Sequence, residues 1–226
     1  YNQDLNIFFG AQIKSLSIQY RSKFNNEILF DSKTKPIQNA AYTKIKWKPN
    51  RNFIIEPGIR LTTFSSKPGL FPDFRLSTKY IINSSQFLNF AFGNYHQFIS
   101  TFQDDFTQQI LDSWFAIDES GNPARASQAV VGYEQFFPQG LKFQVEGYYK
   151  NIKDMLTYEE SRATTDGDFS ESSLLDLLTP ADGYAYGAEI FLQQTTGKLN
   201  GWAGYSWSVS RKKMNDKEYF TNWDRS

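Results

Sequence analysis

Residues 141–150 read Leu-Lys-Phe-Gln-Val-Glu-Gly-Tyr-Tyr-Lys, and the order of side chains in this stretch indicates the class of fold. Apolar residues and glycine occupy every second position: Leu141, Phe143, Val145, Gly147 and Tyr149. The positions between them are polar or charged: Lys142, Gln144, Glu146, Tyr148 and Lys150. Successive side chains of an extended strand point to opposite faces, so a period of two predicts a β-strand with one apolar and one polar face.

The same alternation recurs along the chain, in residues 41–47, 55–62, 184–193 and 199–210. On nearly every one of these stretches the polar face carries Lys, Arg, Glu, Gln or Gly, which suits the water-filled lumen of a membrane barrel. Soluble antiparallel sheets also alternate apolar and polar residues. The alternation by itself therefore leaves a soluble β-sandwich open beside a transmembrane barrel.

Composition favours the barrel. Of the 226 residues, 17% are aromatic, yet the mean hydropathy is −0.54 and the formal charge is zero. No run of 18 apolar residues exists, which excludes a transmembrane helix, whereas barrel strands use aromatic residues at both membrane rims. The charge gives no indication of a nucleic-acid partner, and the absence of cysteine excludes disulfides and thiolate sites.

The connections between the expected strands alternate in length. We expect strands at residues 5–22 (one or two elements), 39–48, 52–65, 74–83, 86–102, 127–137, 141–158, 184–195 and 198–210. Tight turns are expected at 49–51, 83–85, 138–140 and 195–197, and long links at 23–38, 66–73, 103–126, 159–183 and 211–223. Bacterial outer-membrane barrels have short periplasmic turns and long extracellular loops. The expected fold is therefore all-β: an antiparallel up-and-down transmembrane β-barrel with periplasmic tight turns.

Several segments resemble the barrel of TonB-dependent outer-membrane receptors, from about residue 36 to the end. The motifs are Pro72–Tyr80, Gly93–Gln97, Gly132–Glu134, Val145–Lys150, Gly183–Glu189, Gly201–Ser208 and Asp224–Arg225. The resemblance implies a barrel of about 22 strands around an N-terminal plug, of which this chain would supply about nine to ten. The chain opens on Tyr1, so we expect residues 1–226 to be a partial barrel domain without its plug.

The resemblance also implies a function. It predicts an outer-membrane receptor of a Gram-negative bacterium that imports siderophore-bound iron, cobalamin or a glycan with energy from TonB. The implied partners are outer-membrane lipid, the receptor's own plug, TonB through the missing N-terminal region, and the nutrient; no cofactor or nucleic acid is implied. The alternatives are a passive porin or channel, an outer-membrane enzyme, and a soluble carbohydrate-binding β-sandwich.

Two groups of residues are candidate sites. The polar face of the strands carries a charged set that either pairs across strands or, as the resemblance implies, faces the plug: Arg60, Arg75, Lys79, Glu134, Glu146 and Glu189, with Lys44, Lys46, Glu56 and Lys142 beside them. Trp114, Asp118 and Arg125 lie in or beside the long 103–126 link, where exposed aromatic and polar groups could bind a ligand.

Catalytic and metal chemistry is not expected. His96 is the only histidine, which excludes a multi-histidine metal site, and the strand alternation places it in the lipid-facing phase near the outer rim. Acidic pairs in the links lack the spacing of a calcium-binding loop and are interpreted as solvated charge. A short helical turn is possible only at residues 172–178. The chain is therefore not expected to be an enzyme.

Overall fold

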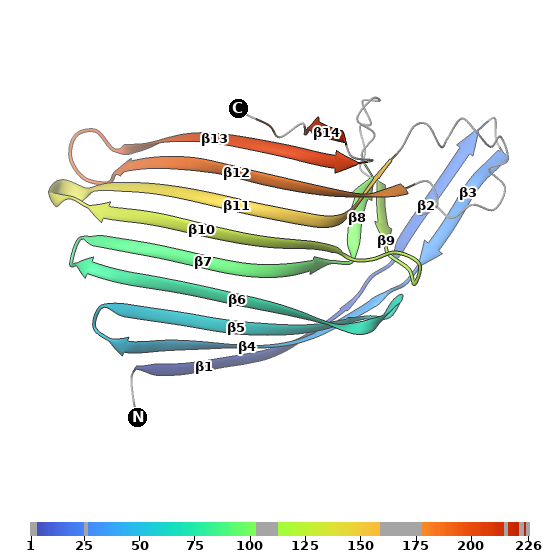
Figure 1. Ribbon diagram of the computed structural model, residues 1–226, viewed down its shortest axis with the longest axis horizontal. Coiled ribbons are helices and arrows are strands. Elements are labelled where there is room, and N and C mark those ends of the chain that lie inside the picture. Colours follow the sequence, from blue (N-terminus) through green and yellow to red (C-terminus); the bar gives the residue numbers. More distant parts are fainter. Residues whose placement is uncertain are drawn as a thin grey trace.

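The computed structural model describes residues 4–24, 27–102, 113–158, 178–214, 217–221 and 224. Its main element is one antiparallel sheet of ten strands (Figure 1). In spatial order the strands are β1 (Leu5–Ser15), β4 (Ile37–Asn50), β5 (Phe53–Phe64), β6 (Lys67–Asn83), β7 (Gln86–Gln97), β10 (Ala124–Phe136), β11 (Leu141–Tyr158), β12 (Leu178–Gln194), β13 (Gly201–Met214) and β14 (Lys217–Phe220).

The spatial order of these ten strands is also their order along the chain. Every neighbouring pair is antiparallel, so the sheet is an up-and-down meander that begins at β1 and ends at β14 without closing on itself. These observations confirm the expected fold class, an antiparallel partial barrel of about ten strands. No helix in the described ranges is long and apolar enough to cross a membrane.

Two additional hairpins lie at one end of the sheet. They are β2 (Ile18–Phe24) with β3 (Glu27–Thr34), and β8 (Ile99–Phe102) with β9 (Ser113–Ala116). The first falls largely within the long link expected at residues 23–38, so this link between β1 and β4 contains a hairpin. Figure 1 shows both hairpins at the end opposite the tight turns. The possible helical turn at 172–178 falls almost wholly outside the described residues.

The tight turns of the meander gather at the other end, at residues 51–52, 84–85, 137–140 and 195–200 (Figure 1). Two of them are closed by an asparagine that precedes the turn. The Asn50 side-chain oxygen accepts hydrogen bonds from the N–H groups of Asn52 (2.9 Å) and Phe53 (3.1 Å). That of Asn83 accepts from the N–H (2.9 Å) and the hydroxyl (3.0 Å) of Ser85. Asparagine favours such turns because its side chain substitutes for a backbone acceptor.

The connection between β5 and β6 differs from the expectation. Residues 66–73 are not a long loop: only residues 65 and 66 join the strands, and Leu61 pairs with Pro72. The alternation of short and long links is therefore not strict. Proline and glycine are tolerated here because a register shift follows Thr62 and because Gly69 adopts a positive φ of 149°.

Register places apolar and polar residues in alternate rows across the sheet. One row, from β5 to β13, consists of Pro57, Leu76, Phe92, Ala129, Tyr149, Tyr186 and Val209. The adjacent row, from β4 to β13, consists of Lys44, Gly58, Arg75, Gly93, Gln128, Lys150, Ala185 and Ser210. The rows define an apolar face and a polar face, which we call the lumen wall.

No described part of the chain covers the apolar face. Tyr205 is 66% exposed and Ile190 42%, and large apolar residues are exposed on most strands. A β-sandwich would bury such residues against a second sheet, so the sandwich alternative does not fit. The compact apolar cluster of the described residues is small: Phe64, Phe98 and Ile117 pack together where the β8–β9 hairpin leaves the sheet.

Candidate functional site

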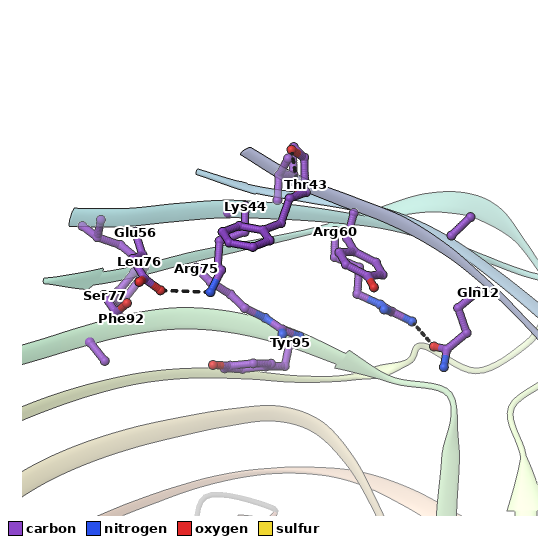
Figure 2. A pocket seen from close by; sticks show the side chains of 16 residues that line it. Gln12, Thr43, Lys44, Glu56, Arg60, Arg75, Leu76, Ser77, Phe92 and Tyr95 are labelled. Carbon is purple, nitrogen blue, oxygen red and sulfur yellow. Dashed lines mark hydrogen bonds and ion pairs between the residues drawn. The ribbon is translucent and has the colours of Figure 1, made fainter. Parts of the chain in front are cut away.

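The lumen wall is the candidate functional site, and it is hollowed over its first five strands. A groove of about 850 Å³ is lined by residues of β1, β4, β5, β6 and β7. Figure 2 shows Lys44 directed at Glu56, with a distance of 3.0 Å between Nζ and Oε2, and Arg60 directed at Gln12, with 2.8 Å between Nη2 and Oε1. Lys46 also approaches Glu56, at 3.4 Å. The expected cross-strand pairing thus accounts for Glu56 and its two lysines.

Tyrosines hold the two arginines of this groove. The Arg60 guanidinium carbon lies 6.0 Å from the centre of the Tyr42 ring, and that of Arg75 lies 4.9 Å from the centre of the Tyr95 ring. A guanidinium over a tyrosine ring is attracted by the ring's electron-rich face. Arg60 and Arg75 were expected on this wall from the sequence, but the two tyrosines were not, although their position on the polar face of their strands was an available signal.

Glu134 forms a second charged group on the wall, closer to the tight turns. Its carboxylate lies 3.2 Å from Nζ of Lys79 on β6 and 3.1 Å from Nζ of Lys142 on β11. Lys79 reaches Glu134 across the intervening strand β7, where its Nζ lies 4.2 Å from the centre of the Phe87 ring. Residues expected to face the lumen are thus brought together here, with an aromatic ring beneath the ammonium group.

Glu146 and Glu189 are directly opposite each other in the register of β11 and β12. Like charges that face each other across two strands are destabilising. Glu146 leans over Gly132, where a Cβ atom would come within 3.0 Å of its Cγ, and it accepts a hydrogen bond from Gln144 (2.8 Å). Among the described residues no cation pairs with either glutamate, so this part of the wall is acidic.

The second candidate group does not form one site, because each of its residues has different contacts: Trp114, Asp118 and Arg125. Trp114 is 56% exposed on β9. The Arg125 guanidinium binds the Asp154 carboxylate of β11, with 2.9 Å between Nη2 and Oδ2. Burial opposes ionisation of Asp118, but hydrogen bonds from Ser120 and Gly121 outweigh it and lower the pKa of this carboxyl. The Asp118 carboxylate therefore stabilises the turn that follows it. Ligand binding by Trp114, Asp118 and Arg125 stays a prediction.

His96 does not face lipid as the strand alternation indicated. Its Nδ1 lies 2.7 Å from Oδ1 of Asp73 on β6, and its side chain is only 13% exposed. The physical reason is local: the pairing of β6 with β7 ends at Arg75 and Gly93, and beyond it the Asn94 side chain binds the N–H of Phe74 (2.7 Å) and the carbonyl of Pro72 (3.1 Å). The Asn94 side chain thus takes the place of the backbone ladder between β6 and β7 here, while β7 stays regularly paired with β10 through Gln97.

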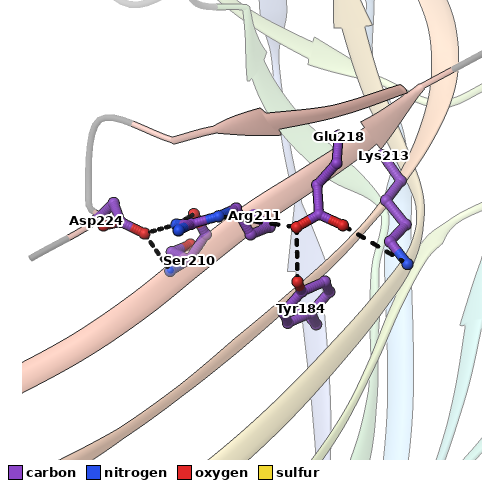
Figure 3. A network of polar contacts seen from close by, with 6 residues as sticks. All are labelled: Tyr184, Ser210, Arg211, Lys213, Glu218 and Asp224. Carbon is purple, nitrogen blue, oxygen red and sulfur yellow. Dashed lines mark hydrogen bonds and ion pairs between the residues drawn. The ribbon is translucent and has the colours of Figure 1, made fainter. Parts of the chain in front are cut away.

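A polar network near the end of the chain was not anticipated from the sequence (Figure 3). The Asp224 carboxylate accepts hydrogen bonds from Arg211 and from the backbone N–H of Ser210 (2.8 Å). Tyr184 donates to Glu218 (2.7 Å), which lies on β14. These contacts hold the end of the described chain against β12 and β13. In the described parts of the chain, no three acidic or histidine residues are grouped as metal ligands would be.

An antiparallel meander with an exposed apolar face and a charged, hollowed polar face is the wall of an outer-membrane type β-barrel. The family described as TonB dependent receptor-like, beta-barrel, matches residues 1–225. The chain therefore belongs to the TonB-dependent receptor-like β-barrel family. This is a family of outer-membrane receptors of Gram-negative bacteria.

Solved structures with the same fold include transporters. The copper transporter OprC superposes with a TM-score of 0.62 at 15% sequence identity, over 96% of this chain and 37% of OprC. The RagAB peptide transporter superposes with a TM-score of 0.57 at 10% identity, over 94% of this chain and 28% of that chain. The RagAB peptide importer in the closed-closed state superposes with a TM-score of 0.55 at 12% identity, over 96% of this chain and 30% of that chain. The chain thus spans about a third of these proteins, and no curated protein sequence matches it.

Proposed function

We propose that this chain forms part of the barrel of an outer-membrane receptor that imports a scarce nutrient with energy delivered through TonB. The observation that carries the proposal is the pair of faces of the ten-stranded sheet, one apolar and exposed, the other charged and hollowed. The tight turns would face the periplasm and the two extra hairpins the outside, as in other outer-membrane barrels. A siderophore-bound iron, cobalamin or a glycan would be the nutrient.

The complete receptor would contain further strands and a plug. Large outer-membrane transporters have about 22 strands and a plugged lumen, and the sheet described here leaves both of its edges available for further strands. The plug and TonB are therefore the expected protein partners. The cheapest check is the flanking reading frame: a plug-sized segment upstream supports the receptor, whereas its absence favours a passive channel.

Uptake measurements test the energy source. Growth of the parent strain on each candidate nutrient should depend on both the receptor gene and the gene for TonB, because a plugged barrel needs the TonB-coupled plug movement to admit its ligand. A strain that lacks TonB but still takes up the nutrient through this barrel would contradict the proposal. Such a result would instead identify a passive channel.

We further propose that Lys79, Glu134, Glu146 and Glu189 contact the plug. The facing glutamates 146 and 189 carry the argument, because their like charges need a cation, and a plug arginine or lysine would supply it. In the complete receptor, the double variant Glu146→Gln with Glu189→Gln should loosen the plug and admit large antibiotics. Glu119→Gln, the same change on an exposed turn, is the control. Unchanged antibiotic exclusion in the double variant would argue against plug contact.

A further inference from the structure

Two glycine–tyrosine–arginine groups lie side by side on the lumen wall. In the first, the Tyr42 ring occupies the space beside Gly10, where any Cβ atom would overlap the ring. In the second, the Tyr95 ring occupies the space beside Gly93 in the same way. Arg60 lies over the first ring and Arg75 over the second. Glycine is thus required for each ring to lie along the sheet, and each ring supports one guanidinium.

The stacking prepares both arginines for an oxyanion. A guanidinium laid on an aromatic face loses side-chain freedom while its N–H groups stay available at the edge of its plane. That edge matches the two oxygens of a carboxylate. Arg60 uses part of it on the neutral amide of Gln12, at 2.8 Å. The arrangement is therefore ordered before any anion arrives.

The carboxylates nearby bind other groups. Asp73 lies opposite Arg60 in the register but binds His96 at 2.7 Å, and Glu56 binds Lys44 and Lys46. In the part of the chain that the structure describes, no carboxylate pairs with Arg60 or Arg75. The wall between the two arginines therefore carries positive charge that is not neutralised by a direct ion pair.

The two arginines are close enough to act together. Arg60 is opposite Asp73, two residues before Arg75 on β6, so the arginines are diagonal neighbours on adjacent strands. Diagonal positions of this kind are about 7–8 Å apart. Arg75 is also flanked in the register by two glycines, Gly58, which adds no side chain, and Gly93, where the Tyr95 ring takes the place of a side chain. The groove around them, about 850 Å³, is within the size range of small-molecule sites.

We propose that Arg60 and Arg75, each held on a tyrosine, bind a carboxylate of the small ligand that crosses this lumen. This inference rests on the proposed transport function and adds a chemical class to it: the transported ligand carries at least one carboxylate. A carboxylate of the plug is the competing source of the same chemistry, and the experiment below separates the two.

Calorimetric titration of the complete receptor in detergent tests the site, with succinate as the probe and dimethyl succinate as its uncharged analogue. Succinate should bind in the millimolar range or tighter, and the diester should not. Arg60→Gln and Arg75→Gln should each weaken binding about tenfold or more, as expected for loss of a charge-assisted hydrogen bond. Arg51→Gln, in a turn at the other end of the sheet, should bind like the wild type.

The outcomes separate the sources. No succinate binding, or equal binding in the glutamine variants, overturns the site. No binding together with increased antibiotic entry in Arg75→Gln would assign the arginines to the plug and also overturns it. Arg60→Lys and Arg75→Lys, which keep the charge, guard against loss of folding and should bind more tightly than the glutamine variants. Succinate binding in detergent does not require TonB. If the receptor binds no succinate but still imports its nutrient in a TonB-dependent way, the carboxylate site is refuted and the proposed transport function is not.

Discussion

Val130 and Val131 are consecutive residues of β10 that lie on opposite faces of the sheet. Val131 pairs with Phe90 and Gly147, is 59% exposed, and lies near the middle of its strand on the apolar face. Val130 lines a smaller hollow of the lumen wall, which Glu146 also lines. Substitution of each valine by arginine makes the same chemical change on the two faces, so the pair tests which face meets lipid.

The expected magnitudes differ widely. An arginine on the lipid face of a barrel costs about 2–4 kcal/mol near the bilayer midplane. Loss of the valine's contact with lipid adds about 1 kcal/mol, roughly half the value for a fully buried valine. Val131→Arg should therefore destabilise the barrel by about 3–5 kcal/mol. Val130→Arg should cost below about 1 kcal/mol, because its charge meets water and lies near Glu146.

The assay is unfolding of the complete receptor by urea in lipid vesicles, followed by the change in electrophoretic mobility between folded and heat-denatured protein. Outer-membrane content of the two variants in cells gives a second readout. Equal destabilisation, or a larger effect for Val130→Arg, would mean that the two faces are assigned the wrong way round or that both are covered by protein.

Three further changes test individual contacts in the same unfolding assay. Asn83→Ala removes the acceptor for the N–H and hydroxyl of Ser85 and should cost about 1–2 kcal/mol, whereas a cost within error would show that the turn forms without its side chain. Glu134→Gln should cost about 1–2 kcal/mol at low salt and less at high salt, because it breaks two partly exposed ion pairs; a salt-independent cost would contradict the electrostatic explanation. His96→Leu should cost about 3 kcal/mol by leaving the buried Asp73 carboxylate without its partner, and adding Asp73→Asn should recover part of the loss.

Much of the sheet was predictable because its signals are local. Alternation in residues 141–150 and in the corresponding stretches of β5, β12 and β13 follows directly from the two faces of a strand. Turn residues such as Asn83 act within three positions of themselves. Pairing within each hairpin then follows from its short turn, because a two-residue connection allows only adjacent antiparallel pairing.

The errors arose where pairing across strands overrides a local signal. The link expected at residues 66–73 includes Pro68 and Gly69, but both lie in strand β6, which pairs with β5 through Leu61 and Pro72. The strand alternation gave His96 the phase of a lipid-facing residue. In the structure the Asn94 side chain replaces part of the ladder between β6 and β7, and His96 binds Asp73. Neither effect can be read from one strand considered alone.

Prediction of the candidate site was also partial. The alternation placed Arg60 and Arg75 on the polar face, and the register groups them. It did not identify the tyrosines beneath them, because a tyrosine on a polar face has several ordinary uses. Pairing of Gly10 with Tyr42 becomes visible only once the register of β1 with β4 is known.

The asparagine-closed turns have a consequence for the order in which the barrel assembles. Asn50 and Asn83 complete their hydrogen bonds with residues at most three positions away, so these hairpins need no third strand to close. Contacts of low sequence separation form fastest, and isolated hairpins form in about 1–10 μs. The hairpin, and not the single strand, is therefore the kinetic unit by which such a wall can lengthen, with one strand pair added at each step.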